Sequence, residues 1–210
     1  MLLLVLNAGS SSLKFDLLDW SGTGAARRLK AGAFIDKGDG SGSFALESAL
    51  PVPPPPAPVR TLAAAADFVL AWLADQNAHG RNLLAEVRAT VHRIVHGGEL
   101  FRATARLGAA DLAALATLDA LAPLHNPPAL AVIAAARARL GERLPLIGVF
   151  DTAYYAQLPE AAWRYAVPAH WYQDLGVRRY GFHGTAHRYL CATARARVLP
   201  GKPARRIVSL

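Results

Sequence analysis

The sequence predicts an α/β fold in which helices cover a mixed β-sheet. Three apolar segments near the N-terminus follow one another at hairpin spacing, and beyond residue 60 helical and strand-like segments alternate. Strands in hairpin order followed by alternating helix and strand are typical of a mixed sheet covered by helices. The 210-residue chain is 53% hydrophobic and 18% charged, which is enough apolar material for a packed core.

The strands are predicted from short apolar runs that end at turn residues. The first run ends at Asn-Ala-Gly, which indicates a buried strand entering a tight turn, and the second run is expected to pair antiparallel with the first. Strands are predicted at residues 2–6, 13–18, 27–35, 87–95 and 144–150, and the beginning of another at 207–210.

The helices are predicted from apolar spacing and from end signals. Thr61 or Arg60 is expected to begin the first helix, and Gly141 stands at a C-cap position of the third. Helices are predicted at residues 61–75, 110–119, 129–140 and 184–198.

Two segments are expected to be irregular. Residues 38–43 are rich in turn formers, and residues 51–58 hold six prolines, which favours a stiff extended loop. Residues 1–150 are expected to form one domain and residues 151–210 to begin a second. Because a domain does not normally end within an apolar strand, we expect the chain to be the N-terminal portion of a longer protein.

Charge and composition exclude several classes of protein. The net charge is +8, and all eight excess cations follow Asp174 with no acidic residue among them. No nucleic-acid motif or basic stripe with interleaved aromatics accompanies them, so nucleic acid is not expected as a partner. A phosphate-rich small ligand or an acidic partner segment explains the asymmetry equally well.

The sequence also predicts a cytoplasmic protein without a membrane partner. The apolar opening at residues 1–6 is too short for a signal peptide and has no basic residues before it, and no apolar stretch reaches the length of a membrane span. The single cysteine, Cys191, excludes an internal disulfide framework. The seven histidines form no zinc-binding pattern.

The turn after the first strand is a candidate phosphate site. Gly9 permits positive φ, and the small residues Ser10 and Ser12 let amides and hydroxyls converge on an anion. Lys14 adds a positive charge, and Asn7 offers an amide oxygen where a metal ion or its waters would lie. The pattern differs from the Walker P-loop, and an ordinary polar hairpin turn is the alternative interpretation.

Five segments of the sequence, taken in order, resemble the acetate kinase family. They span residues 7–187, nearly the whole chain, and each alone would be weak evidence. The five segments are Asn7-Ala-Gly-Ser-Ser-Ser-Leu-Lys-Phe15, His92-Arg-Ile-Val-His-Gly-Gly-Glu99, Leu121-Ala-Pro-Leu-His-Asn-Pro127, Val149-Phe-Asp-Thr-Ala153 and Arg178-Arg-Tyr-Gly-Phe-His-Gly-Thr185. The last segment continues with Ala186 where the family usually has serine.

The resemblance implies an actin/Hsp70/sugar-kinase-like (ribonuclease H-like) fold and a phosphotransferase activity. The implied reaction is transfer of the ATP γ-phosphoryl group to acetate, with Mg²⁺ or Mn²⁺, in a protein that forms a homodimer at full length. Family members are roughly twice as long, so the second phosphate loop and the adenosine pocket are expected beyond residue 210.

The resemblance also implies roles for single residues. Arg93 would bind the substrate carboxylate and the transferred phosphoryl group, and Asp151 and His183 would act in the transfer step. His125 would be a second, supporting histidine. A short carboxylic acid is already ionised at neutral pH, so we expect Asp151 to orient Arg93 or metal-bound water rather than to remove a proton.

Three apolar residues flank these polar ones and complete the expected pocket. Val95, Leu124 and Phe182 would hold the alkyl tail of the acid, and plain core packing is the alternative interpretation. Taken without the resemblance, Arg93 would be a surface ion-pair residue, Asp151 a helix N-cap, and the histidines structural. Two further functions stay open, namely a propionate or butyrate kinase and a non-catalytic chain that only binds a ligand.

Overall fold

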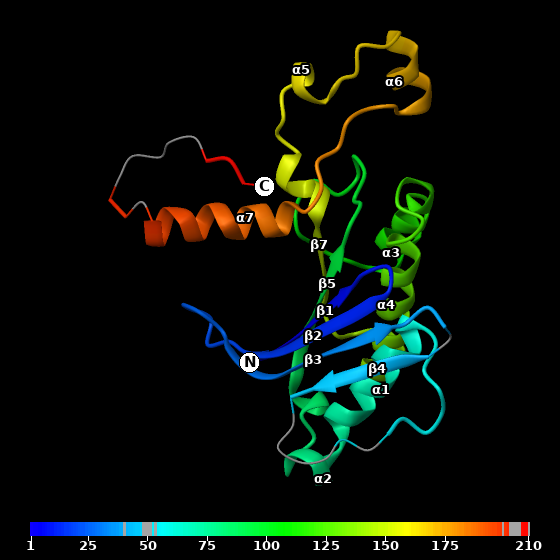
Figure 1. Cartoon of the computed structure of the whole chain (residues 1–210), viewed down its shortest axis with the longest axis vertical. Helices are drawn as coiled ribbons and strands as arrows, with labels where there is room; N and C mark the ends of the chain where they lie inside the picture. The colour runs from blue at the N-terminus through cyan, green and yellow to red at the C-terminus, as the bar shows by residue number, and fades with distance from the viewer. Residues whose placement is uncertain (40, 48–51, 53, 199, 202–206, 210) are drawn as a thin grey trace.

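One mixed β-sheet forms the centre of the molecule (Figure 1). The computed structural model describes residues 1–39, 41–47, 52, 54–198, 200–201 and 207–209. In these residues seven strands lie in the order β4-β3-β2-β1-β5-β7-β6. The strands are β1 (Leu2–Ala8), β2 (Ser12–Asp19), β3 (Arg27–Asp36), β4 (Gly42–Leu46), β5 (Val87–Ile94), β6 (Ala105–Arg106) and β7 (Leu146–Phe150).

Both kinds of strand pairing occur in this sheet, as predicted. The strands β1 to β4 pair antiparallel in hairpin order, whereas β5 pairs in parallel with β1, and β7 in parallel with β5. The sequence analysis missed β4 and β6. It placed a turn over 38–43, although β4 begins at Gly42, where the backbone runs antiparallel to β3.

The four predicted helices are present with shifted ends, and three short helices, Gln76–His79, Glu160–Trp163 and Ala169–Leu175, were not predicted. Thr61 caps α1 by accepting a hydrogen bond from the Ala64 amide, as its position predicted. The helix α4 begins three residues before the predicted start, because prolines fit the first turn of a helix. The helices are α1 (Leu62–Ala74), α2 (Gln76–His79), α3 (Ala109–Ala116), α4 (Asn126–Leu140), α5 (Glu160–Trp163), α6 (Ala169–Leu175) and α7 (Gly184–Thr193). Short 3₁₀ turns cover Leu84–Glu86, Asp119–Leu121 and Asp151–Tyr155, and a π turn covers Ala194–Val198.

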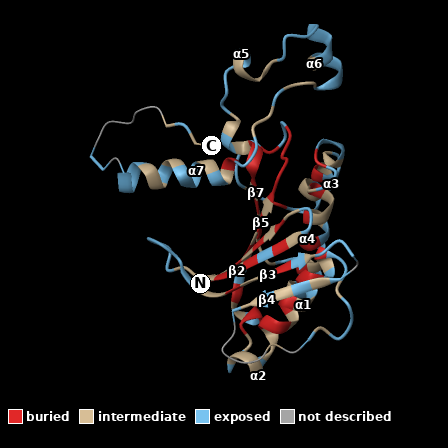
Figure 2. Cartoon of the chain, viewed as in Figure 1, coloured by how far each residue is buried: buried red, intermediate tan, exposed pale blue. Residues whose placement is uncertain are grey.

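One face of the sheet packs against α1 and α4 and forms the main core (Figure 2). Alternate residues of β1, including Leu4 and Leu6, are buried on this face, as strand geometry requires. They pack with Val69 and Leu73 of α1 and with Val132 of α4. Burial of these side chains is the main source of the free energy that holds helices and sheet together.

The opposite face of the sheet carries three polar residues that the sequence analysis assigned to the candidate site. Here the strand register places Lys14 of β2 and Arg93 of β5 on either side of Asn7 of β1. Residues paired across neighbouring strands point to the same face, so the three side chains form one row across the sheet. A turn motif and an arginine motif 86 residues apart are thereby brought together.

The chain after β7 leaves the sheet. The helices α5 and α6 stand away from it on an extended excursion, and α7 projects sideways with only Gly184 buried (Figures 1 and 2). The predicted domain boundary at residue 150 coincides with the end of β7, and the division itself stays a prediction.

Two predicted segments lie partly outside the described residues. The strand expected at 207–210 is wrong for residues 207–209, which pair with no strand; residue 210 lies outside the described residues. Strand formation needs a neighbouring backbone, and the Ser209 hydroxyl instead lies 2.7 Å from His187 Nδ1. Residues 51 and 53 of the proline segment also lie outside the described part, and residues 52 and 54–58 have no regular structure. Among the described residues no helix is long and apolar enough to cross a membrane.

Candidate active site

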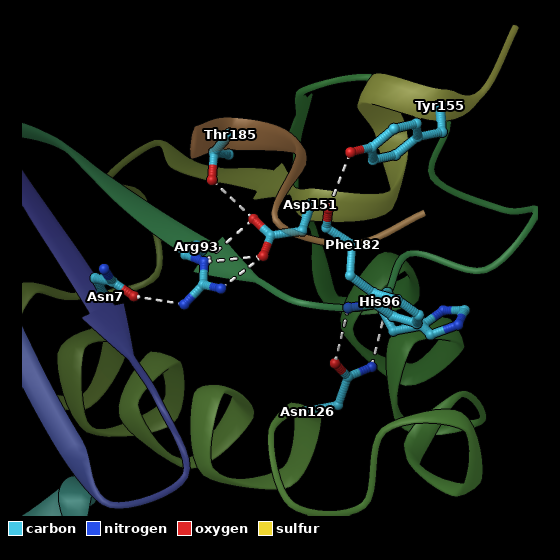
Figure 3. A network of polar contacts seen from close by, with 8 residues as sticks. All are labelled: Asn7, Arg93, His96, Asn126, Asp151, Tyr155, Phe182 and Thr185. Atoms are coloured by element: carbon cyan, nitrogen blue, oxygen red, sulfur yellow. Dashed lines mark hydrogen bonds and ion pairs between the residues drawn. The ribbon is translucent and has the colours of Figure 1, made fainter. Parts of the chain in front are cut away.

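An ion pair between Arg93 and Asp151 is the centre of the candidate site (Figure 3). Arg93 Nη2 lies 2.6 Å from Asp151 Oδ2, and Arg93 Nε lies 3.1 and 3.2 Å from the two carboxylate oxygens. The Asp151 side chain is fully buried, whereas a quarter of the Arg93 side chain is exposed. The exposed part of the pair is therefore an edge of the Arg93 guanidinium, whereas the Asp151 carboxylate that balances its charge is buried.

Sheet topology explains why these two residues meet. Arg93 lies near the end of β5, and Asp151 follows β7 directly, which is the parallel neighbour of β5. The carboxyl ends of adjacent parallel strands lie at the same sheet edge, where α/β proteins commonly place their ligands. The juxtaposition makes a buried carboxylate tolerable, because its charge is paired and hydrogen-bonded.

Thr185 completes the surroundings of the carboxylate. Its hydroxyl donates to Asp151 Oδ1 at 2.8 Å, so both oxygens of Asp151 have partners. The backbone of Gly184, the preceding residue, lies so close to the Asp151 carbonyl that a Cβ atom would overlap it. Asp151 is therefore not the helix N-cap of the alternative interpretation, since its side chain bonds Arg93 and Thr185.

Asn7 contacts the other end of the guanidinium. Its Oδ1 accepts a hydrogen bond from Arg93 Nη1 at 3.1 Å. The described residues contain no group of three or more His, Cys, Asp or Glu side chains that would hold a metal ion. Because the side-chain oxygens of Asn7 and Asp151 accept hydrogen bonds from Arg93, the described residues do not fit a metal site. Metal ligation by Asn7 stays a prediction.

The β1–β2 turn places its polar residues at the surface. Ser10 and Lys14 are exposed, and Ser12 is half-buried at the start of β2. Gly9 does not use positive φ, and its amide donates to the Ser12 carbonyl at 2.7 Å. This amide is therefore occupied by the turn, and the hydroxyls and the Lys14 ammonium are the groups left for an anion. No ion-pair partner of Lys14 occurs in the described part of the chain.

A pocket opens in front of Arg93 and gathers the other predicted residues. All three predicted apolar residues and both predicted histidines line it, although they come from three separate segments of the chain. The lining includes Arg93, Val95, Leu124, His125, Asp151, Phe182 and His183. Val95 is buried, whereas Leu124 and Phe182 are 68% and 42% exposed, so the apolar side of the pocket is open to solvent.

His183 has a strained backbone at the entrance to α7. It is the N-cap of this helix with φ 55° and ψ 25°, and no other described residue except glycine has positive φ. Such conformations are costly outside glycine and cluster at functional sites. The strain is an independent indication that the position of this side chain matters.

His92 lies outside the site although it neighbours Arg93 in sequence. It points to the opposite, buried face of β5, where burial lowers its pKa to about 4. It is therefore a neutral core histidine.

Sequence reasoning missed two residues that hold the site together. Thr185 bonds Asp151, and Asn126 bonds the backbone of His96 (Figure 3). Both lie within the quoted motifs, but they were passed over because their partners are about 30 residues away in sequence. The only available signal was a polar residue next to a predicted functional one.

Comparison with known proteins identifies the family. A model described as the acetokinase family matches residues 2–208. Acetate kinase of Trichlorobacter lovleyi is 39% identical over 97% of this chain and 47% of its own length. Acetate kinase of Deinococcus deserti is 45% identical over 95% of this chain and 47% of its own length. The chain thus spans about half the length of the curated relatives it matches.

Solved structures agree with the predicted fold. The crystal structure of Porphyromonas gingivalis acetate kinase matches with a TM-score of 0.76 at 34% identity, over 96% of this chain and 49% of its own. A propionate kinase from Francisella tularensis matches with a TM-score of 0.80 at 27% identity, over 96% and 50%. These likenesses confirm the predicted actin/Hsp70/sugar-kinase-like architecture.

Proposed function

The chain belongs to the acetokinase family, and from this premise we propose that its protein transfers the γ-phosphoryl group of ATP to acetate. The products are acetyl phosphate and ADP. The observation that supports the proposal best is the guanidinium of Arg93, fixed by Asp151 and Asn7 at the mouth of a small, partly apolar pocket. A short carboxylate fits such a pocket, with its charge on Arg93 and its alkyl group against Val95.

Arg93 retains donors for a substrate. A guanidinium has five N–H groups. Asp151 accepts hydrogen bonds from the Nε–H group and from one N–H of Nη2, and Asn7 accepts one from Nη1. One N–H group on each terminal nitrogen therefore remains. Two parallel N–H groups match a carboxylate or a phosphoryl group. Arg93 is therefore proposed to bind the substrate carboxylate and to stabilise the charge of the phosphoryl group in transfer.

Asp151 is proposed to orient Arg93 rather than to accept a proton. Acetic acid has a pKa close to that of a glutamate side chain, about 4.3, so the substrate carries no proton at neutral pH. In addition, both Asp151 oxygens already accept hydrogen bonds. Phosphoryl transfer depends chiefly on positioning and charge stabilisation. His183 and His125, on the pocket wall, are proposed to donate hydrogen bonds to the migrating phosphoryl group.

The nucleotide is proposed to place its phosphates near the β1–β2 turn. Lys14 is exposed there, and the hydroxyls of Ser10 and Ser12 are available donors. Lys14 also stands in the same row as Arg93, so phosphates at the turn point toward the carboxylate pocket. Mg²⁺ or Mn²⁺ as a cofactor, a homodimer and a cytoplasmic location stay predictions, and no step proposed above passes through a metal.

Propionate is a second candidate substrate. The matching propionate kinase structure and the exposed apolar side of the pocket both favour it. A hydrophobic pocket separates acids that differ by one methylene by only about 1–3 kcal/mol. Acetate is therefore expected to be preferred, with propionate accepted less well.

The test is a substrate panel with the protein at the full length of its relatives. ATP is mixed with acetate, propionate or butyrate, and the acyl phosphate is trapped with hydroxylamine while ADP release is followed. Highest kcat/KM for acetate supports the proposal. A steep preference for butyrate would contradict it. Nucleotide binding without turnover of any acid would instead favour the non-catalytic alternative.

A further inference from the structure

We propose that Asn126 is a positioning residue that sets the width of the carboxylate pocket and thereby the length of acid that the enzyme accepts. This inference rests on the proposed function. Asn126 is not among the residues that line the pocket. It acts through the backbone of His96, to which its side chain is hydrogen-bonded (Figure 3).

The Asn126 side chain forms hydrogen bonds with both backbone polar groups of His96, and we call this pair of hydrogen bonds the clasp. Its Oδ1 accepts a hydrogen bond from the His96 amide at 3.2 Å, and its Nδ2 donates to the His96 carbonyl at 2.9 Å. Both residues are buried, and Asn126 is 0% exposed. A side-chain amide that pairs with both polar groups of one residue fixes distance and orientation together.

The clasp joins two walls of the pocket through short covalent connections. Asn126 follows Leu124 and His125, which line one wall. His96 follows Val95, which lines the other. Each pocket residue is thus one or two residues from a clasped atom, so the separation of the walls follows the length of the two hydrogen bonds.

A third wall depends on the same histidine. The His96 ring packs edge-on against Phe182, with ring centroids 5.6 Å apart, and its Nδ1 accepts a hydrogen bond from the Gly98 amide at 3.0 Å. The Tyr155 hydroxyl donates to the Phe182 carbonyl at 3.1 Å from the other side. Moving His96 therefore moves the surface against which Phe182 rests.

Loss of the Asn126 side-chain amide has a defined consequence. The His96 amide and carbonyl would be left buried without their partners, which is unfavourable until they reach water or new partners. The 95–98 segment and the 122–126 segment would separate as a result. A wider pocket holds a two-carbon acid less firmly and makes room for a longer one.

The experiment compares Asn126→Ala with the unchanged enzyme at the full length of its relatives. Values of kcat and KM are measured for acetate, propionate and butyrate, and KM for ATP is measured at saturating acetate. We expect the ratio of kcat/KM for acetate over propionate to fall by about fivefold or more, within the range that one methylene supplies in an apolar pocket. KM for ATP should stay within about twofold, because the clasp lies away from the β1–β2 turn.

Val69→Ala is the matched control. Val69 is buried in the main core on α1, so its truncation lowers stability without touching the clasp. It should lower the melting temperature and leave the acetate to propionate ratio unchanged. Asn126→Ser, which is too short to make both bonds, is the second variant and should shift the ratio in the same direction.

The outcomes separate this inference from the proposed function. If the unchanged enzyme phosphorylates no acid, the proposed function fails. If it is active and both Asn126 variants keep its ratio, or lose activity equally for all three acids, the inference is wrong. If both variants fail to fold while Val69→Ala folds, Asn126 serves the fold alone, and the inference is overturned as well.

Discussion

Arg93 and Lys14 stand in one row across the sheet with Asn7 between them, yet they are held very differently. Arg93 is three-quarters buried and fixed by Asp151 and Asn7. Lys14 is exposed and has no ion-pair partner among the described residues. The side proposed to bind the carboxylate is therefore preorganised within this chain, whereas the side proposed to bind phosphate offers an exposed, unpaired charge among the described residues. Preorganised charge contributes most to catalysis, so the two cations should respond differently to substitution.

The difference has its origin in the neighbouring strands. Arg93 lies on β5, between β1 and β7, and the first supplies Asn7 while the end of the second supplies Asp151. Lys14 lies on β2, and its partner in β3 is Ala33, which has no polar side chain. Arg93 is fixed because polar side chains lie on both sides of it, whereas Lys14 has a polar neighbour on one side only.

Substitution of Arg93 should have the largest effect. Arg93→Ala is expected to lower kcat/KM for acetate by about a thousandfold, because the fixed charge proposed to bind the acid is lost. Arg93→Lys should recover little, since an ammonium cannot form the paired contacts. Steady-state kinetics give the result, with circular dichroism to verify folding. Activity near that of the unchanged enzyme would show that Arg93 does not bind the acid.

The Asp151→Asn variant distinguishes the proposed role of Asp151 in orienting Arg93 from a role in proton transfer. The neutral amide loses the ion pair but keeps the shape, so kcat/KM is expected to fall by about a hundredfold. The residual activity should keep the pH profile of the unchanged enzyme, because no proton transfer is removed. Loss of the acidic limb of the pH–rate profile, measured from pH 4 to 8, would instead identify Asp151 as a titrating base.

The buried His92, which lies next to Arg93 on β5, is expected to make the stability of the protein depend on pH. Burial lowers its pKa to about 4 in the folded state, below the usual 6.5, so its stabilising effect is complete above pH 6.5 and is lost as the pH falls toward 4. Between pH 7.5 and 5 the free energy of unfolding should decrease by about 2 kcal/mol from this group. Urea unfolding at both pH values measures the decrease. His92→Leu should show a smaller decrease, and an equal one would exclude His92 as the cause.

Lys14 should give the smallest effect. Lys14→Ala is expected to raise KM for ATP by about tenfold, which corresponds to the loss of one partly solvated charge contact of about 1.4 kcal/mol. KM for acetate should stay within about twofold. Lys14→Arg is the matched control and should retain most of the affinity. A larger rise in KM for acetate than in KM for ATP would contradict the proposed difference between Arg93 and Lys14.

The sequence analysis predicted most of the sheet because its strands carry strong local signals. The run at residues 2–6 is apolar enough to be assigned alone, and Asp151 after a buried strand indicated a site by topology. The strands β4 and β6 were missed, since β4 begins inside the turn-rich segment 38–43 and β6 has only two residues, and both exist through pairing. The clasp of Asn126 was also missed, because its partner, the His96 backbone, carries no sequence signal.

The close approach of Gly184 to Asp151 has a mechanical consequence. The helix α7 starts at this contact, and Thr185, in its first turn, holds the carboxylate. The ten-residue helix then extends outward for about 15 Å, so it works as a lever whose fulcrum lies at the ion pair. A tilt that moves the far end by about 3 Å displaces the Thr185 hydroxyl by only a fraction of that distance. A tilt of α7 about this contact is thus expected to act on Asp151, the carboxylate that is paired with Arg93.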